Sequence, residues 1–211
     1  MPIAHRFIAL EGIDGAGKST QLARVAAALR LAGADVVVIF EPGGTPVGAA
    51  VRELLLAPEY PEMTPLTEVF LFCASRAQHC EEVIRPALDA GRVVLCDRFS
   101  ASTFAYQGHA GGVGEDLVVR LDAEATGGLV PDMTIILDLP PEEGLRRKFG
   151  PGARPGADAD RIERNTLEFH RHVREGFHEY ARRYPERTAI VDASGSEHEV
   201  FAAVSAALGM G

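Results

Sequence analysis

The stretch that most constrains this chain is FIALEGIDGAGKST, residues 7–20, in which a short apolar run leads into three glycines and a lysine. From Gly12 to Ser19 it satisfies the pattern G-x-x-x-x-G-K-[ST], at a point where a strand is expected to turn into a helix. The glycines let successive backbone N–H groups point inward at a polyphosphate, and the following helix adds the positive end of its dipole. The segment therefore predicts a P-loop that binds a nucleoside triphosphate. The expected contacts are Gly12, Ile13, Asp14, Gly15, Ala16, Gly17, Lys18, Ser19 and Thr20.

Two side chains of this loop carry the expected chemistry. Lys18 can reach the β- and γ-phosphates, and the Ser19 hydroxyl can hold Mg²⁺. Lys18 stands out because the chain has only 2 lysines against 19 arginines. A switch GTPase also needs the sequence N-K-x-D, and neither Lys18 nor Lys148 follows an asparagine, which argues against that class.

Short β-branched runs alternate with longer helical stretches along the chain, which is typical of an α/β fold with a parallel sheet. Five runs are apolar nearly throughout, as strands covered on both faces are: 6–11, 35–40, 92–96, 133–138 and 188–191. The expected helices are 18–32, 47–56, 66–90, 115–126, 142–149, 159–184 and 197–208. We therefore predict a three-layer P-loop NTPase fold, in one domain over residues 1–211. A short flexible lid is expected at about 149–160, where glycine, alanine and proline dominate.

Charge and hydropathy narrow the expected partners. The formal net charge of −9 argues against a general affinity for nucleic acid. The apolar runs are far shorter than the roughly 18 residues of a membrane span, and the N-terminus lacks the cleavage pattern of a signal peptide. We therefore expect a cytoplasmic protein with no membrane partner, in which Cys73, Cys80 and Cys96 are buried thiols.

The expected strand 92–96 is followed by Asp97 and Arg98. Ligands collect at the carboxyl edge of open α/β sheets, so both residues should face the P-loop. Arg98 is expected to clamp an anionic group, and Asp97 to approach a metal ion or its water shell. An ion pair between these two neighbours is an equal alternative from position alone.

The helix expected at 66–90 is amphipathic, and its predicted core stripe is Leu66, Val69, Phe70, Cys73, Ala77, Cys80 and Ile84. Phe72 and Arg76 lie together beside this stripe and together suit a planar base; the alternative is a core phenylalanine with a solvated arginine. Arg154 and Arg161 lie in or just after the flexible segment. They predict an arginine lid over the phosphates, with a merely solvated loop as the alternative.

Several segments together resemble the thymidylate kinase family, nucleoside monophosphate kinases that phosphorylate dTMP. The resemblance covers nearly the whole chain, and its segments follow the family's order: FIALEGIDGAGKST, EPGGTPVGAAVRELL, FLFCASRAQH, CDRFSASTFAYQG, PDMTIILDLPPEEGLRR, DRIE and VDAS. It implies transfer of the γ-phosphoryl group of MgATP to dTMP, giving dTDP and ADP for dTTP synthesis. It also implies Mg²⁺ as cofactor, ATP as donor and a homodimer.

The resemblance implies roles for the residues of the acceptor site. Phe72 would stack on thymine, Arg76 would bind its carbonyl edge, and Tyr106 would lie under the sugar. Arg98 and Arg52 would hold the acceptor phosphate. The implied dTMP-binding set is Asp14, Arg52, Phe72, Arg76, Arg98, Ser102, Thr103, Tyr106 and Gln107.

The resemblance also implies the catalytic and metal-binding residues. Ala16 stands where some members carry an arginine, so the catalytic arginine would come from the lid, with Arg154 as first candidate and Arg161 as second. The implied catalytic set is Lys18, Asp97, Arg98, Arg154 and Arg161, and the implied Mg²⁺ set is Ser19, Asp97 and Glu163. In the segment VDAS, Ala193 and Ser194 would border adenine.

Two positions depart from the family's pattern: Phe40 precedes Glu41 where many relatives carry arginine, and Gly48-Ala49 replaces G-E. Two rival interpretations also stay open. One is another nucleoside monophosphate kinase that uses UMP or a purine nucleotide. The other is an ATP-binding regulatory protein without turnover, against which the acceptor clamp at Arg98 argues.

Overall fold

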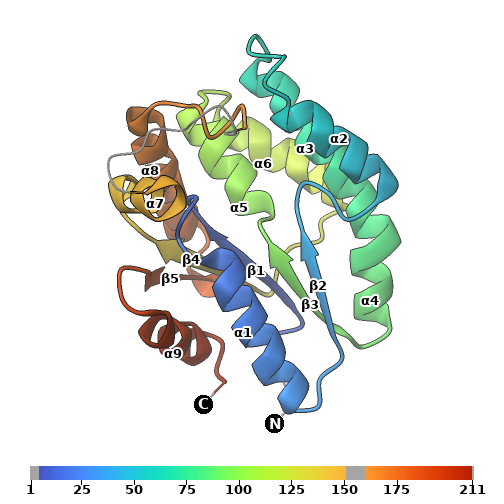
Figure 1. Cartoon of the computed structure of the whole chain (residues 1–211). Helices are drawn as coiled ribbons and strands as arrows, with labels where there is room; N and C mark the ends of the chain where they lie inside the picture. Colours follow the sequence, from blue (N-terminus) through green and yellow to red (C-terminus); the bar gives the residue numbers. More distant parts are fainter. Residues whose placement is uncertain (1–4, 151–159, 211) are drawn as a thin grey trace.

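The computed structural model describes residues 5–150 and 160–210. Five parallel strands form one sheet in the order β2-β3-β1-β4-β5 (Figure 1). The strands are β1 (Phe7–Gly12), β2 (Val36–Phe40), β3 (Val93–Asp97), β4 (Met133–Asp138) and β5 (Thr188–Asp192). All six residues of the central strand β1 are buried, as a strand covered on both faces requires. Because β1 is the middle strand of the five, its carboxyl end lies at the middle of the edge where all five strands end.

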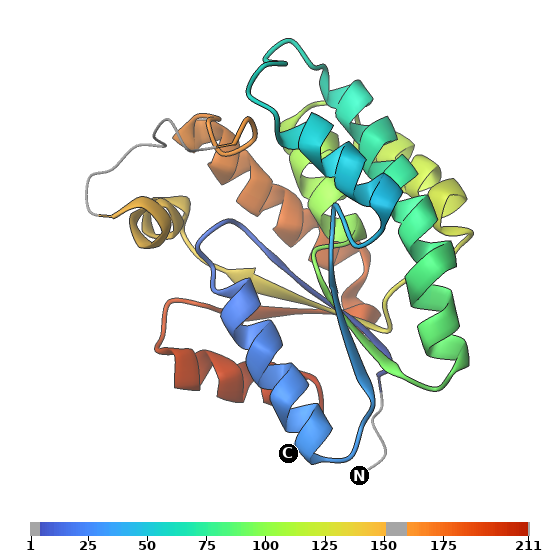
Figure 2. The ribbon, with the colours of Figure 1, turned by 45° about the vertical axis from the view of Figure 1, so that its right-hand side comes forward.

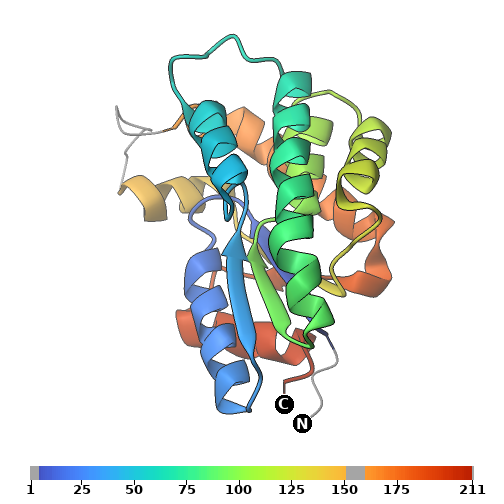
Figure 3. The same cartoon turned by 90° about the vertical axis from the view of Figure 1, so that its right-hand side faces the viewer.

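Helices cover both faces of the sheet and complete three layers (Figure 2). One face packs against α1 (Lys18–Leu31) and α9 (Glu197–Ala207). The other face packs against α4 (Arg85–Asp89), α5 (Ser100–Thr103) and α8 (Leu167–Arg183). Outside these lie α2 (Pro46–Leu56), α3 (Pro65–His79), α6 (Glu115–Thr126) and α7 (Pro141–Phe149). Figure 3 shows α2 and α3 side by side on one flank.

The side chains of β1 alternate between two groups of buried apolar side chains, because successive residues of a strand point to opposite sides of the sheet. Ile8 and Leu10 belong to the larger group. Phe7 and Ala9 belong to the smaller one, where the ring of Phe7 meets that of Phe99 edge to face, with 5.0 Å between centroids. The expected buried thiols are confirmed: Cys73, Cys80 and Cys96 are buried and free.

Two expected helices differ in the structure, and one helical stretch was not expected. The segment 66–90 is a continuous run of α3, a π-helical turn η1 (Cys80–Ile84) and α4. The helix expected from 159 begins only at Leu167, because Thr166 is extended and caps the helix there; the Asp160 carboxylate accepts the backbone N–H groups of Ile162 and Glu163 in a separate turn before it. Residues 100–110, for which no helix was expected, form α5 and the π-helix η2 (Phe104–Ala110).

The predicted core stripe of α3 is wrong at two positions. Leu66 and Phe70 are 41% and 55% exposed, whereas Val69 and Cys73 are buried against Val118 of α6. The buried face of α3 is rotated toward α6, which leaves the other two side chains in solvent. Among the described residues, no helix is long and apolar enough to cross a membrane.

Candidate active site

The P-loop lies at the carboxyl end of β1 and runs directly into α1. Gly12, Gly15 and Gly17 all have positive φ, which favours glycine. A Cβ on Gly15 would also lie 2.1 Å from the carbonyl oxygen of Gly144 in α7. The loop therefore needs its glycines both for its curvature and for its close contact with α7.

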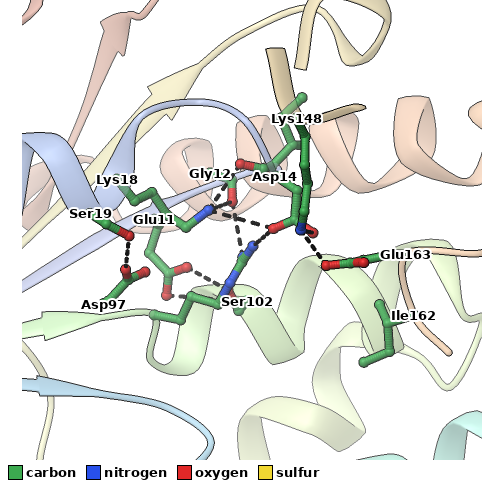
Figure 4. A network of polar contacts seen from close by, with 12 residues as sticks. Glu11, Gly12, Asp14, Lys18, Ser19, Asp97, Ser102, Lys148, Ile162 and Glu163 are labelled. Carbon is green, nitrogen blue, oxygen red and sulfur yellow. Dashed lines mark hydrogen bonds and ion pairs between the residues drawn. The ribbon is translucent and has the colours of Figure 1, made fainter. Parts of the chain in front are cut away.

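Lys18 points back along the loop that precedes it (Figure 4). Its Nζ donates hydrogen bonds to the carbonyl oxygens of Gly12, at 3.1 Å, and Ile13, at 2.9 Å. Burial and the nearby Arg98 guanidinium lower the pKa of Lys18 to about 8, against an opposing effect of Asp14. The site therefore holds a partly desolvated ammonium group that an anionic ligand would stabilise.

Asp14 is the point at which three cationic side chains meet. Its carboxylate lies 2.5 Å from Nη2 of Arg98, 3.2 Å from Nζ of Lys148 and 3.8 Å from Nζ of Lys18. Burial alone would raise the pKa of Asp14, but these cations hold it below its ordinary value. This one carboxylate lies among three cations, at a place that would also suit a phosphate.

Arg98 is held over the P-loop by its backbone as well as by its side chain. It has a φ of 70°, which is uncommon for a residue other than glycine. Its Nη1 donates to the carbonyl oxygen of Gly12, at 2.9 Å, and to Oγ of Ser102, at 3.0 Å. Ser102 donates in turn to the buried carboxylate of Glu11, at 2.6 Å. The structure thus pairs Arg98 with Asp14 and not with its neighbour Asp97, which overturns the ion-pair alternative.

Ser19 and Asp97 form the part of the site that suits Mg²⁺. The Ser19 hydroxyl donates to Oδ2 of Asp97 at 3.0 Å, because the sheet register places Asp97 beside Leu10 at the start of the loop. Mg²⁺ keeps several waters and takes few protein ligands, so one hydroxyl and one carboxylate fit its needs. Glu163, the third expected ligand, is not brought to this pair: its carboxylate binds Nζ of Lys148 and the backbone N–H of Asp160.

A cavity of about 180 Å³ opens beside the P-loop on the side of α3, α5 and η2. The structure brings all nine expected dTMP-binding residues to its wall: Asp14, Arg52, Phe72, Arg76, Arg98, Ser102, Thr103, Tyr106 and Gln107. Tyr106 is buried there, and the Arg98 guanidinium lies over its ring, 5.4 Å from the centroid. These contacts tie the wall of the cavity to the phosphate end of the site.

Arg76 is one of the largest fully buried side chains, which overturns the solvated alternative. Its Nε donates to Glu41 at 2.7 Å, its Nη1 to Asp122, and its Nη2 to Oγ1 of Thr103 at 3.0 Å. The guanidinium also lies over the ring of Phe99, 4.9 Å from the centroid. Burial alone would lower the pKa of Arg76, but the two carboxylates raise it well above its ordinary value. The cavity thus has a rigid, permanently charged donor in its wall.

A larger cleft adjoins this cavity along the P-loop, and part of the expected loop lines it. Asp14, Gly15, Gly17, Lys18, Ser19 and Thr20 do so, whereas Gly12, Ile13 and Ala16 are buried beneath. Five residues line both spaces: Asp14, Glu41, Arg52, Arg98 and Lys148. The two spaces therefore meet at a common wall of charged side chains.

The expected adenine border is only indirectly linked to this cleft. Ala193 and Ser194 do not line it, but their carbonyl oxygens accept hydrogen bonds from Arg147, at 2.9 and 3.3 Å, and Arg147 does line it. Glu197 at the start of α9 lines the cleft as well.

Of the two arginines expected to act from the lid, the structure describes only Arg161. Arg154 and most of the expected lid fall within 151–159, outside the described residues. Arg161 is not brought to the P-loop: its Nη1 binds Glu68 at 2.6 Å and its Nε donates to the carbonyl oxygen of Leu55 at 3.1 Å. Neither the cavity beside α3, α5 and η2 nor the P-loop cleft has Arg161 in its wall.

Sequence reasoning missed several charged residues of the site, among them Glu11, Glu41, Asp122 and Lys148. Glu41 and Asp122 come from β2's end and α6, so their meeting at Arg76 depends on tertiary packing that no local pattern reveals. Lys148 had one signal, since it is the second of only two lysines in the chain. Glu11 stands directly before the first glycine of the P-loop, which was a second usable signal.

Comparison with known proteins agrees with this geometry. The sequence model of the thymidylate kinase family matches residues 10–204. Thymidylate kinase from Deinococcus radiodurans is 50% identical over 202 residues, 96% of this chain and 95% of the relative. That from Desulfosudis oleivorans is 48% identical over 204 residues, with the same coverage. The crystal structure of thymidylate kinase from Ehrlichia chaffeensis superposes with a TM-score of 0.77 at 32% identity, covering 97% of this chain and 98% of the other. With this match over nearly its whole length, a P-loop and a five-stranded parallel sheet, the chain belongs to the thymidylate kinase family.

Proposed function

We propose that the protein transfers the γ-phosphoryl group of ATP to dTMP, giving ADP and dTDP. The observation that carries this function is the shared wall of the two spaces, in which Asp14, Arg98 and Lys148 lie between the P-loop cleft and the nucleoside cavity. ATP would occupy the cleft with its triphosphate in the P-loop. The dTMP phosphate would then lie at Arg98, facing the γ-phosphate.

The reaction needs no general base. A phosphate monoester has a second pKa near ~6, so the acceptor oxygen is already mostly deprotonated at pH 7. The main obstacle is the approach of two anions, since like unit charges 4 Å apart repel by roughly 4 kcal/mol at an effective dielectric constant of 20. Lys18 and Arg98 offset this repulsion and hold the phosphates in line.

Mg²⁺ would be held by Ser19 and Asp97, and it would neutralise charge on the β- and γ-phosphates when bound. Glu163 stays a proposed contributor from the far side of the site, where it holds Lys148. Arg154 stays the proposed lid arginine. Arg161 is better suited to fixing the segment after the lid against α2 and α3.

Selection of thymine would rest on Phe72 and Arg76 in the wall of the cavity. Phe72 offers an apolar ring to the base, and Arg76 offers donors fixed by Glu41 and Asp122. Tyr106, buried beneath the Arg98 guanidinium, would lie under the sugar and favour deoxyribose. Arg52, whose Nη1 is held by the carbonyl oxygen of Pro42 at 3.0 Å, would add a second cation at the acceptor phosphate.

We also propose a homodimer, one domain per chain, working in the cytoplasm. Apolar side chains stand exposed on the flank formed by α2 and α3: Val47, Leu54, Leu66 and Phe70. An apolar surface of this kind is typical of an interface that another subunit covers. Three free buried thiols suit a reducing compartment.

One assay separates this function from its rivals. ADP release should be fast with dTMP and slow with UMP, GMP, AMP or no acceptor. A preference for another nucleotide would identify a different nucleoside monophosphate kinase, and no release with any acceptor would indicate a binding protein. Lys18→Ala and Arg98→Ala should each lower turnover by about 100-fold or more while the fold is retained, because each removes charge from the transferring group. Near-normal rates in either variant would refute the assignment.

A further inference from the structure

We propose that Lys148 is a further phosphate-binding cation, which contacts the transferring phosphoryl group at the junction of the donor and acceptor sites. The inference rests on the proposed function and deepens it. In addition to the proposed lid arginine, the structure places a lysine of α7 at this point, from a helix that is described in full.

The position of Lys148 follows from the packing of α7 on the P-loop. Gly144 and Gly15 lie so close that a Cβ on Gly144 would come within 2.4 Å of the carbonyl oxygen of Asp14. Lys148 lies one helical turn after Gly144, on the same side of α7. Its side chain descends toward Asp14 and Glu163 (Figure 4), and its Nζ lies 3.2 Å from Oδ2 of Asp14.

The other basic residues in the last turn of α7 point elsewhere. Arg146 binds Glu143 on the exposed side of the helix. Arg147 binds Glu143 and the carbonyl oxygens after β5. The helix dipole alone favours basic residues in the last turn of α7. It does not explain why only one of the three, Lys148, lines both the cleft and the cavity. Lys148 lines the cleft and the cavity, and Arg146 lines neither.

The charges around Lys148 are suited to exchange with a ligand. Lys18, Arg98 and Lys148 share the single carboxylate of Asp14, and the second partner of Lys148 is Glu163. Burial alone would lower the pKa of Lys148, but Asp14 and Glu163 raise it above its ordinary value. The ammonium group therefore stays protonated at neutral pH and can turn on its flexible stem from Asp14 toward an incoming phosphate oxygen.

Lys148 moves no proton in this scheme. The dTMP phosphate oxygen forms the new bond to the γ-phosphorus, the bond from that phosphorus to the β,γ-bridging oxygen breaks, and the electron pair leaves with ADP. Lys148 stabilises charge on the oxygens of the group in transit. Its contribution should therefore appear mainly in kcat, since each nucleotide alone retains its own contacts with the P-loop or with Arg98.

The test compares Lys148→Met, Lys148→Arg and the control Arg146→Ala. Lys148→Met should lower kcat by about 100-fold, with KM for ATP and for dTMP changed less than about threefold. Lys148→Arg should recover at least a tenth of the wild-type kcat, and Arg146→Ala should keep full activity. Melting temperatures measured alongside should stay close to that of the wild type.

Binding gives a second readout that does not need turnover. A bisubstrate probe, adenosine and thymidine joined by five phosphates, should bind the Lys148→Met variant at least 10-fold more weakly, while dTMP alone binds as to the wild type. A kcat of Lys148→Met within threefold of the wild type, or equal weakening of the probe and of dTMP, would overturn the inference. A wild-type enzyme that failed to phosphorylate dTMP would instead refute the proposed function.

Discussion

Asp14 governs the electrostatics of the site at the scale of single residues. Its carboxylate holds Arg98, Lys18 and Lys148 together before any nucleotide arrives. Three cations at such short range would otherwise repel one another, and their shared counter-ion keeps them within reach of a common ligand. The same crowding, together with burial, lowers the pKa of Lys18 to about 8.

This lowered pKa predicts a pH dependence. As pH rises through about 8, free enzyme should lose the Lys18 charge, so kcat/KM for ATP should fall. Bound triphosphate stabilises the ammonium form, so kcat itself should not show this limb. Lys18→Arg should be slower but should lack the limb, because a guanidinium stays protonated. A wild-type kcat/KM that is flat up to pH 9.5 would contradict the assignment.

The fall in kcat/KM would not reflect loss of the fold. The folded-state pKa of Lys18, about 8, lies below the ordinary value of 10.5. Between these values the unfolded chain binds more protons than the folded one, so this residue makes the free energy of unfolding rise with pH. Thermal unfolding measured from pH 8 to 9.5 separates loss of the Lys18 charge from loss of the fold, because only the second would lower the melting temperature in parallel with kcat/KM.

The buried guanidinium of Arg76 leads to a second prediction. Asp122→Asn removes one of its two carboxylate partners, which should lower the free energy of unfolding by about 3 kcal/mol and raise KM for dTMP. Asp116→Asn is the matched control on the same helix, because Asp116 forms only an exposed pair with Arg183 and should change stability by less than about 0.5 kcal/mol. Urea unfolding and steady-state kinetics measure both, and equal effects of the two substitutions would contradict the role of Asp122.

At the scale of elements, the contact between α7 and the P-loop positions the charged side chains. Gly144 lies in the middle of α7, where alanine would ordinarily stabilise a helix by about 0.5–1 kcal/mol. Here the substitution should act in the opposite direction. The new Cβ would lie 2.4 Å from a backbone oxygen of the P-loop, so α7 or the loop must shift.

Gly144→Ala should therefore destabilise the protein by about 1–2 kcal/mol and reduce kcat, because Lys148 and Asp14 move apart. Gly195→Ala is a suitable control: its Cβ would meet only the flexible Glu199 side chain, at 3.2 Å. Chemical denaturation and kcat measurements compare the two. A stabilised Gly144→Ala variant would show that α7 is free to move away from the loop.

The strands and the P-loop were predictable because their signals are local. Apolar runs fix β1, β3 and β4, and the glycine pattern fixes the loop after β1. The helical run of residues 100–110 was missed because it is buried on several sides, so it has no clear apolar stripe. The start of α8 was missed because Thr166 caps the helix only after a separate turn, which the Asp160 carboxylate holds.

At the scale of the whole molecule, distant segments meet at the carboxyl edge of the sheet. The composition of the cavity wall followed from the family resemblance, but the partners of each side chain did not. Glu41, Asp122 and Lys148 reach the site from the end of β2, from α6 and from α7, and the order of the strands brings these ends together. Arg161 shows the reverse case: although it closely follows the expected lid in sequence, it binds Glu68 of α3 and does not line the P-loop cleft.

The exposed apolar side chains of α2 and α3 lead to a prediction about the oligomeric state. The wild type should have a mass near twice 22.6 kDa by light scattering, and Phe70→Asp should give a particle of about one chain, because it places a charge in the apolar surface. Leu31→Asp alters a side chain that is 90% exposed at the end of α1 and should stay dimeric. A wild-type protein with the mass of one chain would refute the proposed homodimer.

The scarcity of lysine gives the protein an unusual chemical property. Both of its ε-amines lie at the proposed nucleotide site, and their pKa values shift in opposite directions: burial lowers the pKa of Lys18 to about 8, whereas Asp14 and Glu163 raise that of Lys148. A small acylating reagent should therefore modify Lys18 first, apart from the terminal amine, and abolish activity when about one group per chain has reacted. Bound ATP should protect the enzyme, so the labelling stoichiometry would count its working sites directly.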